Sequence, residues 1–123
     1  MSEETKRILI VEDEKAMANA LRLKLEHEGF VVQMVNDGDE AKNLLADNKF
    51  DLILTDLMMP KFSGFDLLHK LKEMEENTPV VVLSNLSQSE DLEKAKKLGA
   101  RDYLVKSDIS LAEIVVKVKA LLT

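Results

Sequence analysis

Short apolar runs alternate with longer amphipathic segments along almost the whole chain, and this alternation limits the available folds more than any other feature. The apolar runs are rich in Val, Ile and Leu and are bounded by polar or turn-forming residues, which is typical of buried strands. They cover residues 7–11, 31–35, 51–55, 79–84 and 102–105. The segments between them place apolar residues at helical spacing. They cover residues 14–28, 37–47, 63–75, 87–100 and 110–122.

Start and stop signals support these helices. At several predicted helix starts a hydroxyl or carboxylate residue stands three positions before an acid, which is the spacing of a capping box. The pairs are Asp37 with Glu40, Ser87 with Glu90, and Ser110 with Glu113. Gly29 and Gly99 follow apolar periodic segments and are predicted to end two of the helices. The pattern therefore predicts five strands and five helices in strict alternation.

Strands that are apolar throughout and joined by helices favour a parallel sheet covered by helices on both faces, an α/β fold of three layers. The runs at 7–11, 51–55 and 79–84 are the most apolar, so we expect them at the centre of the sheet. The crossovers between parallel strands are expected to be right-handed. With 123 residues and no linker, repeat or low-complexity tract, residues 1–123 are predicted to form a single domain.

The composition argues against several classes of protein. The chain carries 23 acidic against 17 basic residues, a formal charge of −6, which disfavours a large nucleic-acid-binding surface. It has no cysteine, so disulfides, thiol catalysis and cysteine-ligated metals are excluded. The polar start of the sequence is unlike a signal peptide, and no apolar run approaches the roughly 20 residues of a membrane span. These features predict a cytoplasmic protein.

Polar and charged residues follow four of the five predicted strands. They are Glu12, Asp13 and Glu14 after the first strand, Asp56 after the third, Ser84 and Asn85 after the fourth, and Lys106 after the fifth. The carboxyl ends of parallel strands meet at one edge of a sheet, where such folds bind their ligands. Each residue alone has an ordinary explanation, as a first-turn acid, a strand-end hydroxyl or a solvated lysine. Their convergence at one edge favours a shared functional site instead.

The charges at this edge indicate a metal ion and a phosphoryl group. Glu12, Asp13 and Asp56 would lie within a few ångströms of one another, and each close pair would repel by roughly 4 kcal/mol at an effective dielectric constant near 20. An all-oxygen cluster of this kind favours a hard divalent ion, Mg²⁺ first and Mn²⁺ as an alternative. With the Lys106 ammonium and the Ser84 hydroxyl nearby, an aspartate could accept a phosphoryl group as an aspartyl phosphate.

Four pieces of the sequence form a set. They are ILIVEDE at 8–14, DLILTDLMMPKFSG at 51–64, PVVVLS at 79–84 and GARDYLVK at 99–106. In this order and spacing they resemble the CheY-like receiver domain of response regulators, the phosphoacceptor module of two-component signalling. The resemblance extends over residues 7–122. It implies a flavodoxin-like (βα)5 sandwich whose five-stranded parallel sheet has the order 2-1-3-4-5.

The resemblance implies a role for each residue of the acidic cluster. Asp56 would be phosphorylated by a histidine kinase or a phosphotransfer protein. Asp13, Asp56 and the backbone carbonyl of Met58 would bind Mg²⁺, and Glu12 would contact the waters of the metal. The chain would then be a signalling switch rather than an enzyme, catalysing only its own phosphorylation and a slow dephosphorylation.

The resemblance also implies how the chain responds to phosphorylation. Lys106 would pair with the phosphoryl oxygens, and the Ser84 hydroxyl would bond to one of them. Tyr103 matches the aromatic switch position, which turns inward when the hydroxyl residue moves toward the phosphate. The face formed by the last strand and the helices beside it would then change its preference for a downstream protein or effector domain. The chain would be a monomer or a weak phosphorylation-dependent dimer, binding neither nucleic acid nor membrane directly.

Several positions depart from the family's pattern. Ser107 replaces the proline that usually follows the lysine with a cis bond, and a cis bond before serine would cost about 3 kcal/mol, so a trans bond and a reshaped loop are expected. Asn85 replaces a small residue beside Ser84 and is expected either to narrow access to the phosphoryl group or to donate a hydrogen bond to it. Met58 and Leu86 offer no polar side chain to orient an attacking water, which predicts slow autodephosphorylation.

Other functions fit the sequence less well. A haloacid-dehalogenase phosphatase needs a second aspartate two residues after the nucleophile, where Met58 stands. A Toprim-like nucleic-acid domain needs an Asp-x-Asp that is missing, and a flavodoxin needs a hydroxyl- and glycine-rich phosphate loop after the first strand. A pseudo-receiver, which keeps the fold as a protein-interaction module and is never phosphorylated, stays open as the alternative.

Overall fold

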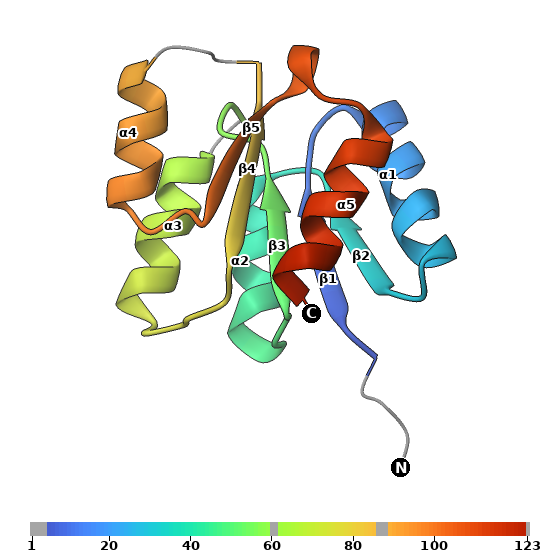
Figure 1. Cartoon of the computed structure of the whole chain (residues 1–123). Coiled ribbons are helices and arrows are strands. Elements are labelled where there is room, and N and C mark those ends of the chain that lie inside the picture. Colours follow the sequence, from blue (N-terminus) through green and yellow to red (C-terminus); the bar gives the residue numbers. More distant parts are fainter. Residues whose placement is uncertain (1–4, 60–61, 86–88, 123) are drawn as a thin grey trace.

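The computed structural model describes residues 5–59, 62–85 and 89–122. Its centre is a sheet of five parallel strands in the order β2-β1-β3-β4-β5 (Figure 1). The strands are β1 (Arg7–Val11), β2 (Val31–Val35), β3 (Leu52–Thr55), β4 (Val80–Ser84) and β5 (Asp102–Val105). The predicted α/β fold and strand order are confirmed, and β1, β3 and β4 lie at the centre as their apolar sequences predict.

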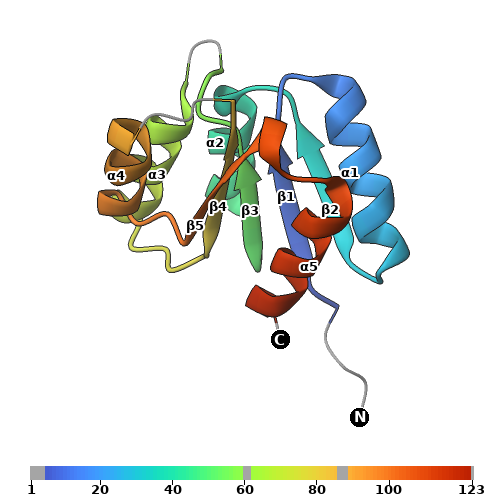
Figure 2. The ribbon, with the colours of Figure 1, turned by 45° about the horizontal axis from the view of Figure 1, so that its top comes forward.

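Helices follow each strand along the chain and cover both faces of the sheet. They are α1 (Lys15–His27), α2 (Gly38–Asp47), α3 (Gly64–Glu73), α4 (Ser89–Lys97) and α5 (Leu111–Leu122). α1 and α5 lie on one face, and α2, α3 and α4 lie on the other (Figure 1, Figure 2). A short 3₁₀ turn, η1 (Lys106–Asp108), follows β5. In the described part of the chain, no helix is long and apolar enough to cross a membrane.

β1 illustrates why the sheet needs helices on both faces. Its residues Leu9 and Val11 belong to the core beneath α2, α3 and α4, whereas Ile8 and Ile10 belong to the core beneath α1 and α5. All four side chains are almost completely buried. A strand segment with no face left for water must be apolar throughout, as residues 8–11 of β1 are.

Side-chain caps fix the starts of two helices where the sequence predicts them. The Asp37 carboxylate accepts a hydrogen bond of 2.8 Å from the Glu40 N–H at the start of α2. At the start of α5, the Ser110 hydroxyl accepts from the Glu113 N–H, and the Glu113 carboxylate accepts from the Ser110 N–H. Each bond satisfies a main-chain donor that the helix itself leaves unpaired.

The helix ends depart from the predicted bounds by a few residues. Gly29 and Gly99 have φ of +98° and +104°, a backbone conformation that other residues rarely adopt, so the chain turns away there as predicted. The prediction of residues 63–75 for α3 is too long, because Ser63 caps the helix from outside and Glu75 already has a positive φ of 56°. The prediction of 87–100 for α4 is also too long, and the cap at Ser87 lies outside the described residues.

Gly38, the first residue of α2, lies against the loop that follows β3. A Cβ atom on Gly38 would lie 2.1 Å from the Phe62 carbonyl oxygen and 2.5 Å from the Phe62 Cβ. No side chain fits between two backbones this close. The loop that leads from Asp56 into α3 therefore packs directly on the start of α2.

Replacing Gly38 with alanine is expected to lower the free energy of unfolding by about 2 kcal/mol, because the added methyl group must displace the Phe62 backbone. Urea unfolding followed by circular dichroism measures the loss. Gly29→Ala is the matched control, because its Cβ would meet nothing within 4 Å and it reports only the cost of a positive φ, about 1 kcal/mol. Equal losses in the two variants would contradict the steric argument.

Candidate functional site

The strand ends bring the polar residues of the sequence together at one edge of the sheet. The Glu12 N–H donates to the Val35 carbonyl at 3.1 Å, and the Asp56 N–H donates to the Val11 carbonyl at 3.0 Å. These bonds continue the parallel ladders by one residue beyond β1 and β3, so the backbone fixes where both side chains start. The Glu12 and Asp56 side chains are buried, whereas that of Asp13 is exposed.

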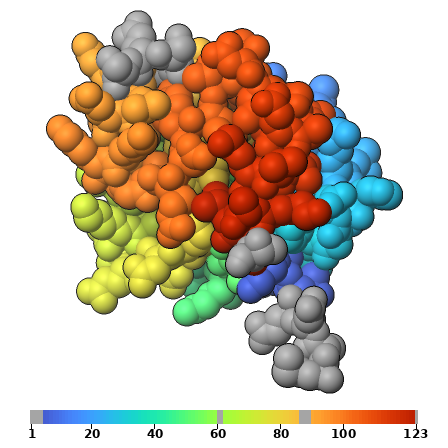
Figure 3. All heavy atoms as spheres, in the orientation of Figure 1, coloured from blue at the N-terminus to red at the C-terminus, as the bar shows by residue number. Residues whose placement is uncertain are grey.

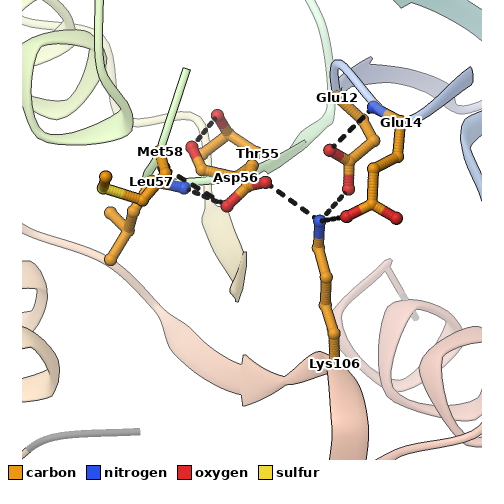
Figure 4. A network of polar contacts seen from close by, with 7 residues as sticks. All are labelled: Glu12, Glu14, Thr55, Asp56, Leu57, Met58 and Lys106. Atoms are coloured by element: carbon orange, nitrogen blue, oxygen red, sulfur yellow. Dashed lines mark hydrogen bonds and ion pairs between the residues drawn. The ribbon is translucent and has the colours of Figure 1, made fainter. Parts of the chain in front are cut away.

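The Asp56 carboxylate is hydrogen-bonded on both oxygens (Figure 4). Its Oδ1 accepts from the Leu57 N–H at 2.7 Å and from the Met58 N–H at 3.3 Å. Its Oδ2 accepts from the Lys106 Nζ at 2.9 Å. A carboxylate this deep in the fold needs such partners, and the Lys106 ammonium provides the opposite charge.

Lys106 meets three carboxylates (Figure 4). Its Nζ forms an ion pair with Glu12, lies 2.9 Å from Asp56 Oδ2 and lies 3.3 Å from Glu14 Oε1. Burial alone would lower the pKa of Lys106, but the hydrogen bonds and charges of Glu12 and Asp56 raise it above its usual range, so the ammonium stays charged. The bond to Ser107 is trans, as expected, and η1 still carries the lysine to Asp56.

Glu12 holds its proton more tightly than an ordinary glutamate. Burial raises the pKa of Glu12 to about 7; its hydrogen bond to Lys106 opposes this change, and the nearby Asp56 charge strengthens it. The carboxyl group therefore changes its charge near neutral pH, in the middle of the acidic cluster.

The raised pKa of Glu12 predicts that stability falls as the pH rises. Between pH 4.5 and about 7 the folded protein holds a proton that the unfolded chain has lost, so the free energy of unfolding is expected to drop by about 3 kcal/mol. Glu12→Gln cannot lose this proton, and its stability is expected to vary less over that range. Urea unfolding in a chelator at a series of pH values measures the slopes, with the exposed Glu40→Gln as control. An unchanged slope in Glu12→Gln would refute the assignment.

Ser84 and Tyr103 form a second polar pair beside the acids. Ser84 ends β4 and is 1% exposed, and Tyr103 on β5 is 7% exposed, with its ring in the core beneath α2, α3 and α4. Burial raises the pKa of Tyr103, a hydrogen bond with the Ser84 side chain opposes the change, and the charges of Asp91 and Asp56 add to it. Because the Tyr103 ring is buried, it already lies inward, the position that the resemblance implies for the switched state.

A hollow of about 330 Å³ opens above Asp56. Its lining residues are Asp13, Glu14, Asp56, Met58, Ser84 and Asn85. The Met58 side chain is 64% exposed, so it stands at the rim of the hollow rather than in the core. The hollow gives a ligand a direct path to the Asp56 carboxylate.

The acids of the hollow fit a divalent cation. Glu12, Asp13 and Asp56 each offer one carboxylate oxygen, and these oxygens all lie within 4.8 Å of one another. Hard oxygen donors that carry several negative charges suit Mg²⁺, which also keeps waters on its open positions. The residues present therefore fit Mg²⁺, the ion that the sequence predicts here.

The sequence placed Glu14 at this edge of the sheet but gave it no role in the site, and the structure shows its carboxylate 3.3 Å from the Lys106 Nζ. Its only signal was its position directly after Glu12 and Asp13, where it reads equally well as a first-turn acid of α1. Leu86, one of the two residues expected to slow autodephosphorylation, lies outside the described residues.

Known proteins share this sequence pattern. The family model for the response regulator receiver domain matches residues 8–119. The chain is 35% identical over 115 residues to the uncharacterized transcriptional regulatory protein YkoG of Bacillus subtilis, covering 94% of this chain and 50% of the relative. It is 36% identical over 116 residues to the transcriptional regulatory protein CusR of Escherichia coli, covering 94% and 51%. The chain therefore spans about half the length of the curated relatives it matches.

Solved structures share the fold. The receiver domain of the Francisella response regulator 1452 has a TM-score of 0.89 and 35% identity, covering 96% of this chain and 97% of that chain. A CheY-like response regulator receiver domain protein from Methanospirillum hungatei has a TM-score of 0.90 and 26% identity, covering 97% and 94%. Because the family model, the relatives and the fold agree over nearly the whole length, the chain belongs to the family of response regulator receiver domains.

Proposed function

We propose that the chain is a phosphorylation-dependent switch of two-component signalling that acts in the cytoplasm. Asp56 takes a phosphoryl group from a histidine kinase or a phosphotransfer protein in a reaction that needs Mg²⁺. The proposal rests on one contact: the Lys106 Nζ lies 2.9 Å from Asp56 Oδ2, beside the cluster of carboxylates. A group attached to Asp56 would have the lysine next to its oxygens.

The transfer joins an Asp56 carboxylate oxygen to phosphorus while the bond between phosphorus and the histidine nitrogen breaks. The electron pair of that bond stays on the nitrogen, which takes up a proton and leaves as a neutral imidazole. The Leu57 and Met58 N–H groups hold the Asp56 carboxylate in one orientation. Lys106 neutralises charge on the oxygens of the transferring group, so most of the catalysis is positioning and electrostatics.

The acids beside Asp56 are the proposed metal site. Asp13, Asp56 and the Met58 carbonyl would hold Mg²⁺, with Glu12 beside its waters. When bound, the ion supplies positive charge to the phosphoryl oxygens. The protein's own part is to keep these oxygen donors together against their mutual repulsion, which the buried Lys106 ammonium reduces.

The proposed output is a change at the surface formed by α4, β5 and α5. These elements present one continuous face to solvent (Figure 3). The Ser84 hydroxyl, now bonded to Tyr103, would turn to a phosphoryl oxygen on Asp56, and the tyrosine would lose that partner. A downstream protein or effector domain would read the altered face, with the chain a monomer or a weak phosphorylation-dependent dimer. The chain itself need not touch nucleic acid, although its relatives are named as transcriptional regulators.

The test is the intact mass of the protein after incubation with Mg²⁺ and a small-molecule phosphodonor. We expect one added phosphoryl group, which is absent when a chelator replaces the metal and absent in Asp56→Asn. Asp47→Asn, an exposed acid at the end of α2, is the matched control and should react like the wild type. An unmodified wild type, under conditions that preserve acyl phosphates, would favour the pseudo-receiver.

The phosphorylated state is expected to last longer than seconds. Hydrolysis needs a water held in line with the phosphorus, and the exposed Met58 side chain offers no hydrogen bond to orient it. Met58→Asn is expected to shorten the lifetime several-fold, and Met58→Leu to leave it nearly unchanged. The decay of the phosphorylated mass after removal of the donor measures the lifetime. A wild-type lifetime below seconds would contradict the expectation.

A further inference from the structure

Glu14 supplies the least buried of the three carboxylates that contact the Lys106 ammonium. The Glu14 Oε1 lies 3.3 Å from the Lys106 Nζ (Figure 4), and the Glu14 side chain is 55% exposed, whereas that of Glu12 is 5% exposed. Glu14 is the N-cap residue of α1, but among the described residues its side chain accepts no capping hydrogen bond from that helix. Its carboxylate is therefore oriented by the lysine and not by the helix.

Glu14 stands at the entrance to Asp56 without belonging to the metal cluster. It lines the hollow of about 330 Å³ above Asp56. The residues whose oxygens come close enough to share an ion are Glu12, Asp13 and Asp56. Removing the charge of Glu14 would thus leave both the phosphoacceptor and the metal ligands in place.

The Lys106 ammonium has three N–H donors, and three carboxylates surround it. A phosphoryl oxygen that pairs with Lys106 must take the place of one of them. Asp56 and Glu12 are buried and close, whereas the Glu14 contact is the longest and the most open to water. Glu14 is therefore the partner that an incoming phosphoryl group displaces.

We propose that Glu14 is a positioning residue that selects phosphodonors by charge. It occupies Lys106 before transfer and repels donors in proportion to their negative charge. This inference rests on the proposed function. Acetyl phosphate carries more negative charge at neutral pH than phosphoramidate does, so Glu14 slows acetyl phosphate more.

Two donors with the same transferred group test the inference. With acetyl phosphate, the bond from Asp56 oxygen to phosphorus forms as the phosphorus–oxygen bond breaks, and the electron pair leaves with acetate. With phosphoramidate, the phosphorus–nitrogen bond breaks, and its electron pair leaves on the protonated nitrogen as ammonia. Rates of phosphorylation are measured at saturating Mg²⁺ in low and high salt, for the wild type, Glu14→Gln and Glu14→Asp.

Glu14→Gln is expected to speed the reaction with acetyl phosphate about fivefold and that with phosphoramidate less than about twofold. High salt should shrink this difference, because the charge is exposed. Glu14→Asp keeps the charge and should stay near the wild type. Glu26→Gln, which removes a charge from the exposed pair with Arg22 on α1, is the matched control and should leave both rates unchanged.

The outcomes separate this inference from the function beneath it. Suppose that the wild type is phosphorylated, but Glu14→Gln changes the rates with both donors equally or changes neither. This result would overturn the proposed role of Glu14 and leave the proposed function standing. The role would also be overturned if high salt left the difference between the two donors in Glu14→Gln unchanged, because salt screens an exposed charge but not a local structural effect. A wild type that takes up no phosphoryl group from either donor would overturn both proposals.

Discussion

Replacing Lys106 with methionine is expected to lower the free energy of unfolding by about 3–5 kcal/mol in the absence of divalent metal. Methionine keeps much of the side chain's volume but leaves Glu12 and Asp56 without their cation. Both carboxylates are buried, at 4% and 7% exposed, so the water that reaches them through the hollow compensates only part of the lost charge. The loss should be largest well above pH 7, where Glu12 is charged, and smaller near pH 5, where Glu12 takes up a proton.

Urea unfolding in a chelator measures this loss, and Lys117→Met is its matched control. Lys117 pairs with Asp102 at 3.8 Å between half-exposed side chains, a contact that contributes at most about 1 kcal/mol. Added Mg²⁺ should restore part of the stability of Lys106→Met, because a second cation then compensates the same acids. A variant as stable as the wild type at high pH would show that Lys106 does not stabilise the carboxylates.

Magnesium is expected to raise the free energy of unfolding of the wild type by about 4 kcal/mol at a thousand times its Kd. Asp13→Asn should raise the free energy of unfolding of the metal-free protein and reduce the stabilisation that Mg²⁺ provides. Without metal the variant should be more stable than the wild type, because one of three mutually repelling acids is gone. With metal it should gain much less, because a ligand and a charge are missing.

A titration of thermal unfolding with Mg²⁺ separates these two effects of Asp13→Asn. Asp47→Asn removes an exposed acid at the end of α2 and should follow the wild type at every concentration. If Asp13→Asn gained as much as the wild type, the metal would bind outside the acidic cluster. If Asp13→Asn were less stable than the wild type in the absence of Mg²⁺, repulsion among the three acids would not destabilise the metal-free protein.

The pattern of apolar runs was enough to predict the sheet and the meeting of its polar strand ends. β1 is apolar on both faces because helices cover both, so its sequence alone identifies it as central. Asp56 directly follows another such strand, and the ladder bond to Val11 sets it beside the acids that follow β1. Residues 50 positions apart, Asp56 and Lys106, therefore meet through topology that the alternation of elements already implies.

Side-chain pairing within the site could not be predicted in the same way. Three consecutive acids, Glu12, Asp13 and Glu14, follow β1, and which of them faces Lys106 depends on the path of the turn into α1. The contact between Gly38 and Phe62 could not be predicted from the sequence either, because it joins the start of α2 to the loop after β3, and no periodic pattern predicts how closely the two approach. Local patterns specify elements, but loop conformation and side-chain rotamers decide such contacts.

The hydrogen bonds that orient Asp56 Oδ1 come from the main chain of Leu57 and Met58. Every residue except proline supplies such an N–H, so almost any substitution at these positions keeps both donors. The Met58 side chain is turned to solvent, and mutation there leaves the core untouched. A substitution at position 58 can thus change the chemistry at the rim of the hollow while the main chain keeps Asp56 in the same orientation.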